Sequence, residues 1–195
     1  MLSAHARQGF TLIELMVTLA VLATLTTLAT PSFMRWLANA QTRAMADELQ
    51  NGLKLAQAEA LRLQRQTLFF RSAVVACDDR AQPDSAGTHW VIRTIPLLAD
   101  EAARIVQCGA LNGASTNVLV DGPVALCFNS IGRPVANPAP GVDGLQCVVP
   151  NNGRLQFDAS NAKGDRALRV TVSVGGGIRM CDPSRERSVA PEGCE

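Results

Sequence analysis

The feature that most constrains this chain is an apolar run near its N-terminus, GFTLIELMVTLAVLATLTTLATP (residues 9–31), which holds one charged residue, Glu14. As a helix, residues 10–30 would span about 31 Å at roughly 1.5 Å per residue, the thickness of a bilayer's hydrocarbon core. Threonine hydroxyls can bond back to the preceding turn, so they cost little in such a helix. The run therefore predicts a membrane-spanning helix.

A secretory signal peptide is the first alternative, and the sequence argues against it. The apolar run is too long, and the bulky residues Met34, Arg35 and Trp36 follow it where a signal peptidase needs small side chains. The polar stretch MLSAHARQG precedes the run and ends in glycine. A cut between Gly9 and Phe10 would leave the apolar helix on the mature protein.

A lone carboxylate inside a membrane helix is costly and usually has a partner. The octapeptide GFTLIELM resembles the class III leader junction of type IV pilins and type II secretion pseudopilins. This resemblance implies that prepilin peptidase cuts after Gly9 and methylates the new amino terminus on Phe10. It also implies that Glu14 pairs with the terminal amine of a neighbouring subunit during assembly.

The charges that flank the run depart from the usual pattern of a membrane anchor. The leader, residues 1–9, contains only Arg7 and His5 as basic residues, whereas Arg35 and Arg43 lie on the far side of the run. The positive-inside signal is therefore weak.

A second helical pattern follows Pro31, where we expect a kink because proline removes a backbone donor. Residues 31–66 are amphipathic, with an apolar stripe at intervals of three and four residues: Met45, Leu49, Leu53, Ala56, Ala60 and Leu63. This stripe needs a covering surface, so we predict one long helix that runs from the membrane into a globular head.

The period changes after Thr67 to short runs rich in β-branched residues. We predict strands at 67–77, 89–95, 103–108, 117–130, 145–150, 153–159 and 167–174, which are separated by Gly-, Pro- and Asn-rich turns. The fold class is therefore α+β, with a long N-terminal helix packed on an antiparallel β-rich head over residues 67–195.

The cysteines all lie in the predicted head and form no Cys-x-x-Cys pair, which argues for disulfides in an oxidising compartment rather than for a metal site. Their spacing leaves the connectivity open. Pairing between neighbours would give Cys77–Cys108, Cys127–Cys147 and Cys181–Cys194.

The segments ADELQNGLKLAQAEALRLQRQ, VALCFNSIGRPV and VTVSVGGGIRMC together resemble the GspH/FimT subfamily of minor pilins and pseudopilins. The resemblance implies a minor pilin that primes, caps or functionalises a type IV pilus, with other major and minor pilins as partners. It implies a single-pass protein of the bacterial inner membrane with a periplasmic head, which later reaches the cell surface in the assembled pilus. A GspH-type pseudopilin of a type II secretion system shares almost every feature.

A FimT-like receptor that binds double-stranded DNA during natural transformation is another alternative. DNA binders of this kind carry a Gly-Arg-x-Arg motif near the C-terminal end. Aligned on GGGIRMC, this chain keeps Arg179 but has Gly177 in place of the first arginine. Arg185 and Arg187, which we expect on a mobile loop, could supply phosphate contacts, although Asp182 and Glu186 lie among them.

The sequence offers no credible active site, cofactor site or metal site, and we predict that the protein is not an enzyme. Charge is nearly balanced, with 18 basic and 17 acidic residues. His89 is expected in a strand, the pairs Asp78/Asp79 and Asp100/Glu101 in turns without EF-hand spacing, and Gly175–Gly177 in a flexible bend rather than in a phosphate loop.

Overall fold

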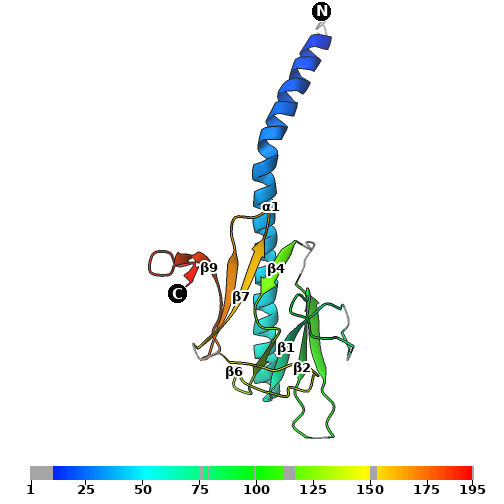
Figure 1. Ribbon diagram of the computed structural model, residues 1–195, viewed down its shortest axis with the longest axis vertical. Helices are drawn as coiled ribbons and strands as arrows, with labels where there is room; N and C mark the ends of the chain where they lie inside the picture. Colours follow the sequence, from blue (N-terminus) through cyan, green and yellow to red (C-terminus); the bar gives the residue numbers. More distant parts are fainter. Residues whose placement is uncertain are drawn as a thin grey trace, which may run out of the picture.

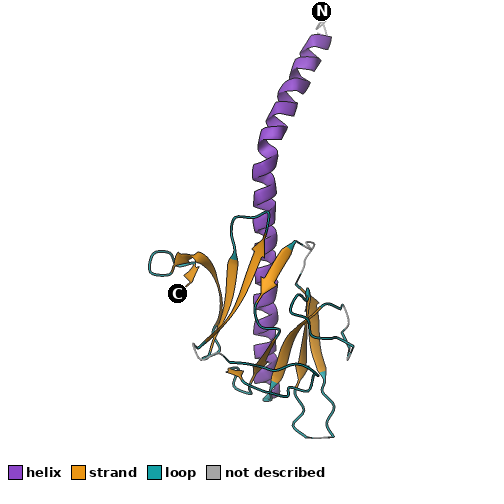
Figure 2. Cartoon of the chain, viewed as in Figure 1, coloured by secondary structure: helices purple, strands orange, loops and turns teal. Residues whose placement is uncertain are grey.

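The computed structural model describes residues 11–74, 77–78, 80–98, 100–111, 117–149 and 153–194. One helix, α1 (Leu12–Leu63), projects from a β-rich head with its N-terminal half and lies along the head with its C-terminal half (Figure 1). The strands all gather around the C-terminal half, as Figure 2 shows. The predicted α+β architecture, a long helix packed on antiparallel sheets, is confirmed.

Helix α1 continues through Pro31 without interruption, and it curves gently instead of breaking (Figure 1). Hydroxyl groups near the proline bond back to the helix, for example Thr30 Oγ1 to the carbonyl of Thr26 at 2.7 Å. The helix ends at Leu63, three residues earlier than predicted, because Gln64 adopts a left-handed conformation with φ of 51°.

The predicted apolar stripe of α1 forms the centre of the head. Leu49, Leu53, Ala56 and Ala60 are fully buried, and Met45 is 3% exposed. The stripe packs against both sheets in one cluster that includes Phe69, Phe128, Phe157 and Val170. Burial of such side chains contributes about 1.5–3 kcal/mol each, so this cluster fixes the helix on the head.

The first sheet has the strand order β3-β2-β1-β5-β6, and all its pairs are antiparallel. Its strands are β1 (Thr67–Ser72), β2 (His89–Thr94), β3 (Ile105–Ala110), β5 (Ala125–Phe128) and β6 (Pro134–Val135). One face covers the helix. The other face builds a second buried cluster, in which Leu68 and Phe70 lie beneath Leu145.

The second sheet has the order β10-β9-β8-β7-β4. Its strands are β4 (Val118–Asp121), β7 (Arg154–Asn161), β8 (Leu168–Ser173), β9 (Ile178–Glu186) and β10 (Gly193–Cys194). The pairs are antiparallel except that the two-residue β10 runs parallel to β9. Both sheets pack against α1.

The single strand predicted at 117–130 is wrong, because this segment forms β4 in the second sheet and β5 in the first. Gly122, with φ of 145°, and Pro123 interrupt the pairing between them. The buried guanidinium of Arg71 holds the crossover: Nη1 donates to the carbonyl of Val120 at 2.7 Å, and Nη2 donates to that of Gly122 at 3.0 Å.

The strand predicted at 145–150 is also wrong. Within its described part, Cys147 makes an isolated bridge to Asn137, and the disulfide to Cys127 tethers the segment. The strand predicted at 67–77 ends already at Ser72. We expected Arg185 and Arg187 on a mobile loop. This prediction is wrong for Arg185, which belongs to β9, whereas Arg187 lies in the turn that follows the strand.

The six cysteines form three disulfide bonds between successive residues in the sequence. Cys77–Cys108 has a Cα–Cα distance of 5.8 Å, Cys127–Cys147 one of 5.6 Å, and Cys181–Cys194 one of 5.1 Å. The first two brace the first sheet, and the third joins β9 to β10. By restricting the unfolded chain, each typically contributes about 2–4 kcal/mol.

Candidate functional site

The N-terminal half of α1 presents an apolar surface that no other part of the described chain covers. Every residue from 11 to 37 is exposed, including Leu12 at 74% and Leu28 at 78%, and burial begins at Ala38. The threonine hydroxyls of this half bond to carbonyls three or four residues earlier. Within the described residues, α1 is also the one helix long and apolar enough to cross a membrane.

Glu14 is the one charged residue on this surface before Arg35, and it lies in the first turn of α1. Thr11 caps the helix, since its Oγ1 accepts a hydrogen bond from the Glu14 N–H at 3.3 Å. The exposed carboxylate is thus held at the helix N-terminus, where the helix dipole favours negative charge. Gly9 and Phe10, the predicted cleavage and methylation residues, lie outside the described residues.

A polar clasp joins α1 to one turn of each sheet. The side-chain amide of Gln57 donates from Nε2 to the carbonyl oxygens of Gly132 and Gly176, both at 2.7 Å. Gly132 follows β5, and Gly176 lies in the turn between β8 and β9. The glycine run predicted as a flexible bend is therefore a tight turn that is bonded to the helix.

Of the three arginines that the sequence grouped as a DNA site, the structure sets Arg185 apart from Arg179 and Arg187. Arg179 donates from Nη2 to the carbonyls of Pro191 at 2.6 Å and Gly193 at 2.9 Å. Arg185 forms ion pairs with Asp182 at 3.8 Å and with Glu192. Both guanidinium groups thus bind the C-terminal turn of the chain itself.

Arg179 and Arg187 instead share a hollow of about 250 Å³ with two arginines that the sequence analysis missed, Arg154 and Arg169. The hollow lies on the outer face of β7, β8 and β9. Asp158 accepts two hydrogen bonds from Arg169, at 2.6 and 2.9 Å, which raise the pKa of that guanidinium. The alternation of RLQFD and LRVTVS, which puts every second side chain on one face, was the signal that could have found them.

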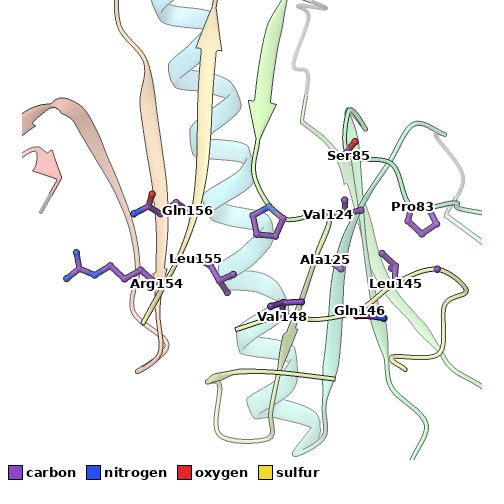
Figure 3. Close-up of a pocket in the computed structure, with 12 residues that line it drawn as sticks. Pro83, Ser85, Val124, Ala125, Leu145, Gln146, Val148, Arg154, Leu155 and Gln156 are labelled. Atoms are coloured by element: carbon purple, nitrogen blue, oxygen red, sulfur yellow. The ribbon is translucent and has the colours of Figure 1, made fainter. Parts of the chain in front are cut away.

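A larger cleft of about 650 Å³ opens between the two sheets. In Figure 3 Leu155 of β7 faces the cleft, while the side chains of Arg154 and Gln156 project to the opposite side of the strand. The first sheet contributes Ala125 of β5, and Val124 lies directly before it. Arg154 is the one charged residue among those that line it, so these residues offer mixed polar and apolar contact without an acid–base pair.

Three of the titratable groups noted in the sequence, Glu101, Asp78 and His89, have structural partners. Glu101 pairs with Arg65 at 2.5 Å, and hydrogen bonds from Arg65 and from the Leu97 N–H lower the pKa of its carboxyl group. Hydrogen bonds from Arg80 likewise lower the pKa of Asp78. His89 lies half-buried in β2 with Nδ1 3.2 Å from Thr88 Oγ1, and Asp79 lies outside the described residues.

Asp182 is the most deeply buried carboxylate among the described residues, with a side chain 4% exposed. It accepts hydrogen bonds from the Ser184 hydroxyl at 2.6 Å and from Arg166 Nη2 at 3.0 Å. These bonds, that of Ser184 first, hold the pKa of Asp182 below its usual value. Over the described residues, no three His, Cys, Asp or Glu side chains gather to hold a metal ion.

Comparison with known proteins gives two family matches. Residues 4–30 match the prokaryotic N-terminal methylation motif, and residues 45–176 match the family described as type II transport protein GspH. No curated protein matches the chain at a significant level.

The fold is similar to two solved structures. The type IV minor pilin FimU of Pseudomonas aeruginosa is 17% identical with a TM-score of 0.50, over 80% of this chain and 97% of that one. The minor pseudopilin EpsH from the Type 2 Secretion System of Vibrio cholerae is 13% identical with a TM-score of 0.48, over 74% of this chain and 99% of that one.

The resemblance predicted from the sequence is thereby confirmed. The GspH match covers most of the head and α1 from Met45 onward, and the FimU fold agrees with a long helix on antiparallel sheets. Such proteins are structural subunits and not enzymes, and the N-terminal motif with its apolar helix indicates a membrane anchor with the head outside. The chain belongs to the GspH family and is a type IV pilin-like minor pilin or pseudopilin.

Proposed function

We propose that this protein is a minor pilin that helps to prime, cap or functionalise a type IV pilus. Prepilin peptidase removes residues 1–9 by cutting after Gly9 and methylates Phe10. Residues 10–30 then anchor the subunit in the inner membrane and later enter the core of the fibre, while the head, residues 67–195, faces the periplasm and afterwards the cell exterior.

The observation that carries this proposal is the exposed apolar half of α1 with its one early carboxylate. About 26 residues of helix have no partner within the described chain, and their exposed apolar side chains are far too many for an aqueous surface. A bilayer covers this surface before assembly, and the helices of other pilins cover it afterwards. Glu14 finds its partner in the second state, where the terminal amine of a neighbouring subunit replaces the lost solvation.

A pseudopilin role in a type II secretion system is the first alternative, and the description of the matched GspH family supports it. The three disulfides favour the pilus instead, since cross-links of this kind suit a head that leaves the periplasm.

Deletion of the gene, followed by complementation with a tagged chain, distinguishes the two machines. We expect the deletion strain to lose surface pili, and we expect the tagged protein to appear in sheared fibres. Loss of secreted exoproteins with intact pili would instead assign the protein to the secretion system.

Binding of double-stranded DNA is the other alternative, and the four arginines around the hollow on the second sheet are the observation that favours it. Arginine clusters on one face are typical of phosphate contacts. A salt series tests this function, because each phosphate contact steepens the fall of affinity with salt. DNA binding requires that Arg154→Gln/Arg187→Gln reduce the salt slope, while the matched pair Lys54→Gln/Arg133→Gln leaves it unchanged. Absence of binding at low salt would remove this alternative.

A further inference from the structure

We propose that the end of the head nearest the apolar half of α1 is a docking surface for the phospholipid headgroups of the membrane that holds the helix. This surface, which we call the membrane-proximal rim, consists of Arg35, Trp36, Arg43, Lys163 and Arg166. The inference rests on the proposed membrane anchoring of α1 and adds an orientation: before assembly, the head rests on the bilayer instead of hanging free.

The position of the rim along α1 follows from the apolar surface of the helix. Exposed apolar side chains continue beyond Thr30 through Phe33 and Met34. Because a carboxylate is costly in hydrocarbon, we expect Glu14 to lie in the headgroup layer at one end of the membrane segment. A hydrocarbon segment of residues 15–34 is then about 30 Å long. It ends directly before Arg35.

The aromatic residues at this point support the same placement. Trp36 is 64% exposed, and its ring centroid lies 5.8 Å from that of Phe33, which is 58% exposed. Tryptophan is enriched at the membrane–water interface, where its ring lies among the headgroups. The pair therefore marks the outer interface at the base of the head.

The head contributes the loop between β7 and β8, which is the part of the head nearest the projecting half of α1 (Figure 1). Asn39 of α1 fixes this loop: its Nδ2 donates to Asp165 Oδ1 at 2.6 Å, and its Oδ1 accepts from the Arg166 N–H at 3.2 Å. A Cβ on Gly164 would lie 2.7 Å from the Asn39 Oδ1, so a glycine is needed for this close approach. Lys163 and Arg166 are thereby held on the outside.

A groove of about 480 Å³ lies between this loop, β9 and α1. Its lining combines apolar side chains, among them Trp36 and Met180, with Arg43 and Arg166. The acids Asp182 and Glu192 also line it, and both are paired with arginines. The Arg43 side chain is 69% exposed and its pair with Asp47 is long, at 4.0 Å. Arg166 is 55% exposed and bonded to Asp182 at 3.0 Å, which leaves other N–H groups of its fork for a phosphate.

The charge of the rim is complementary to an anionic membrane surface. The four basic side chains have Asp47, Asp165 and Glu192 as the acids near them. Asp165 is already bonded to Asn39, and Glu192 is paired with Arg185. Basic residues close to an anionic leaflet are attracted to it, and the attraction falls off within a Debye length. The proposal also accounts for Arg35 and Arg43, whose place beyond the membrane segment contradicts the positive-inside pattern.

The test uses the full chain in lipid nanodiscs, with amide hydrogen exchange of residues 162–167 as the readout. We expect exchange in this loop to be severalfold slower in discs of phosphatidylcholine with phosphatidylglycerol than in discs of phosphatidylcholine alone, and high salt should remove the difference. Arg43→Gln/Lys163→Gln should lose the difference. The matched variant Lys54→Gln/Arg133→Gln, which removes the same charge far from the rim, should keep it.

Equal exchange in the two lipids, with the apolar half of α1 still protected by the bilayer, would overturn the headgroup site and leave the membrane anchor intact. Loss of protection along the apolar half of α1 itself would overturn the anchor on which the site depends. One experiment therefore distinguishes the two failures, because each is measured in a different segment of the chain.

Discussion

The side-chain amide of Gln57 donates a hydrogen bond of 2.7 Å to the carbonyl oxygen of Gly176 and a second, equally short, to that of Gly132. One side chain of α1 thus joins the turn between β8 and β9 of the second sheet to the turn after β5 of the first. The sheets belong to separate hydrogen-bonded ladders, so this clasp helps to fix their positions relative to each other and to the helix.

Replacement of Gln57 by leucine should lower the free energy of unfolding of the head by about 2 kcal/mol, because two part-buried carbonyls lose their donor. Urea unfolding of the full chain in detergent, followed by the fluorescence of the buried Trp90, measures the change. Gln50→Leu, at a half-buried position on the same helix, is the control and should shift stability by less than about 0.5 kcal/mol. Equal effects of the two variants would remove the role of the clasp.

Gly176→Ala should be at least as damaging as the loss of Gln57. Gly176 has φ of 89°, and a Cβ there would lie 2.5 Å from the Gly132 carbonyl oxygen and 2.8 Å from Gln57 Nε2. Backbone strain alone costs about 1–3 kcal/mol, and the clash adds to it. The neighbouring Gly175→Ala, whose Cβ meets nothing closer than 3.8 Å, should be nearly neutral in the same unfolding experiment. A neutral Gly176→Ala would contradict the tight turn.

Asp182→Asn should destabilise the head by about 2 kcal/mol at neutral pH, since Arg166 and Ser184 lose a charged acceptor. The folded pKa of Asp182 is depressed, so its stabilisation is present above the unfolded value of about 3.9 and is lost as pH falls through the folded one. The stability difference between wild type and variant should therefore shrink below about pH 4. Asp47→Asn, at a half-exposed ion pair, is the control and should show little difference at any pH. A pH-independent effect of Asp182→Asn would contradict the stabilising role of the ionised Asp182 carboxylate.

The periodicity of the sequence predicted the helix and its buried stripe because both depend on local spacing, and Met45, Leu49 and Leu53 are buried as expected. The sequence predicted less well where one strand ends and to which sheet it belongs. Residues 117–130 looked like one strand because the apolar pattern continues across Gly122 and Pro123, but the chain changes sheets there, under two hydrogen bonds from the distant Arg71. No local pattern encodes such a tertiary contact.

For the surface sites, too, the sequence predicts what depends on neighbouring residues and misses what depends on tertiary contacts. Glu14 could be singled out because its apolar surroundings are adjacent in the sequence. The arginines around the hollow, by contrast, come from three strands and a turn, and only the pairing of β7, β8 and β9 brings Arg154 and Arg187 to one place. Arg185, which the sequence had grouped with Arg187, is instead paired with Asp182 and Glu192.

Gly9→Ala should leave an uncleaved precursor, because prepilin peptidase would lose the residue after which it cuts. The precursor and the mature chain differ by nine residues, so immunoblots of membrane fractions separate them. Gln8→Ala, one residue earlier, should be processed normally. Normal processing of Gly9→Ala would remove the leader assignment and with it the methylated terminus on Phe10.

Glu14→Ala should be processed normally but fail to enter fibres. The bond cut after Gly9 is several residues away from Glu14. We therefore expect that processing does not need the Glu14 carboxylate. In the proposed fibre, the apolar half of α1, which is exposed in the single chain, lies among other helices. There the terminal amine of a neighbour would need the carboxylate as its partner. We expect the variant in the membrane fraction and its absence from sheared fibres, as judged by immunoblotting of both. Glu48→Ala, which removes an exposed acid from the head half of the same helix, should reach the fibres at the level of the wild type. Unimpaired incorporation of Glu14→Ala would show that the carboxylate has no part in pairing, and the apolar contacts of α1 would then have to hold the subunit alone.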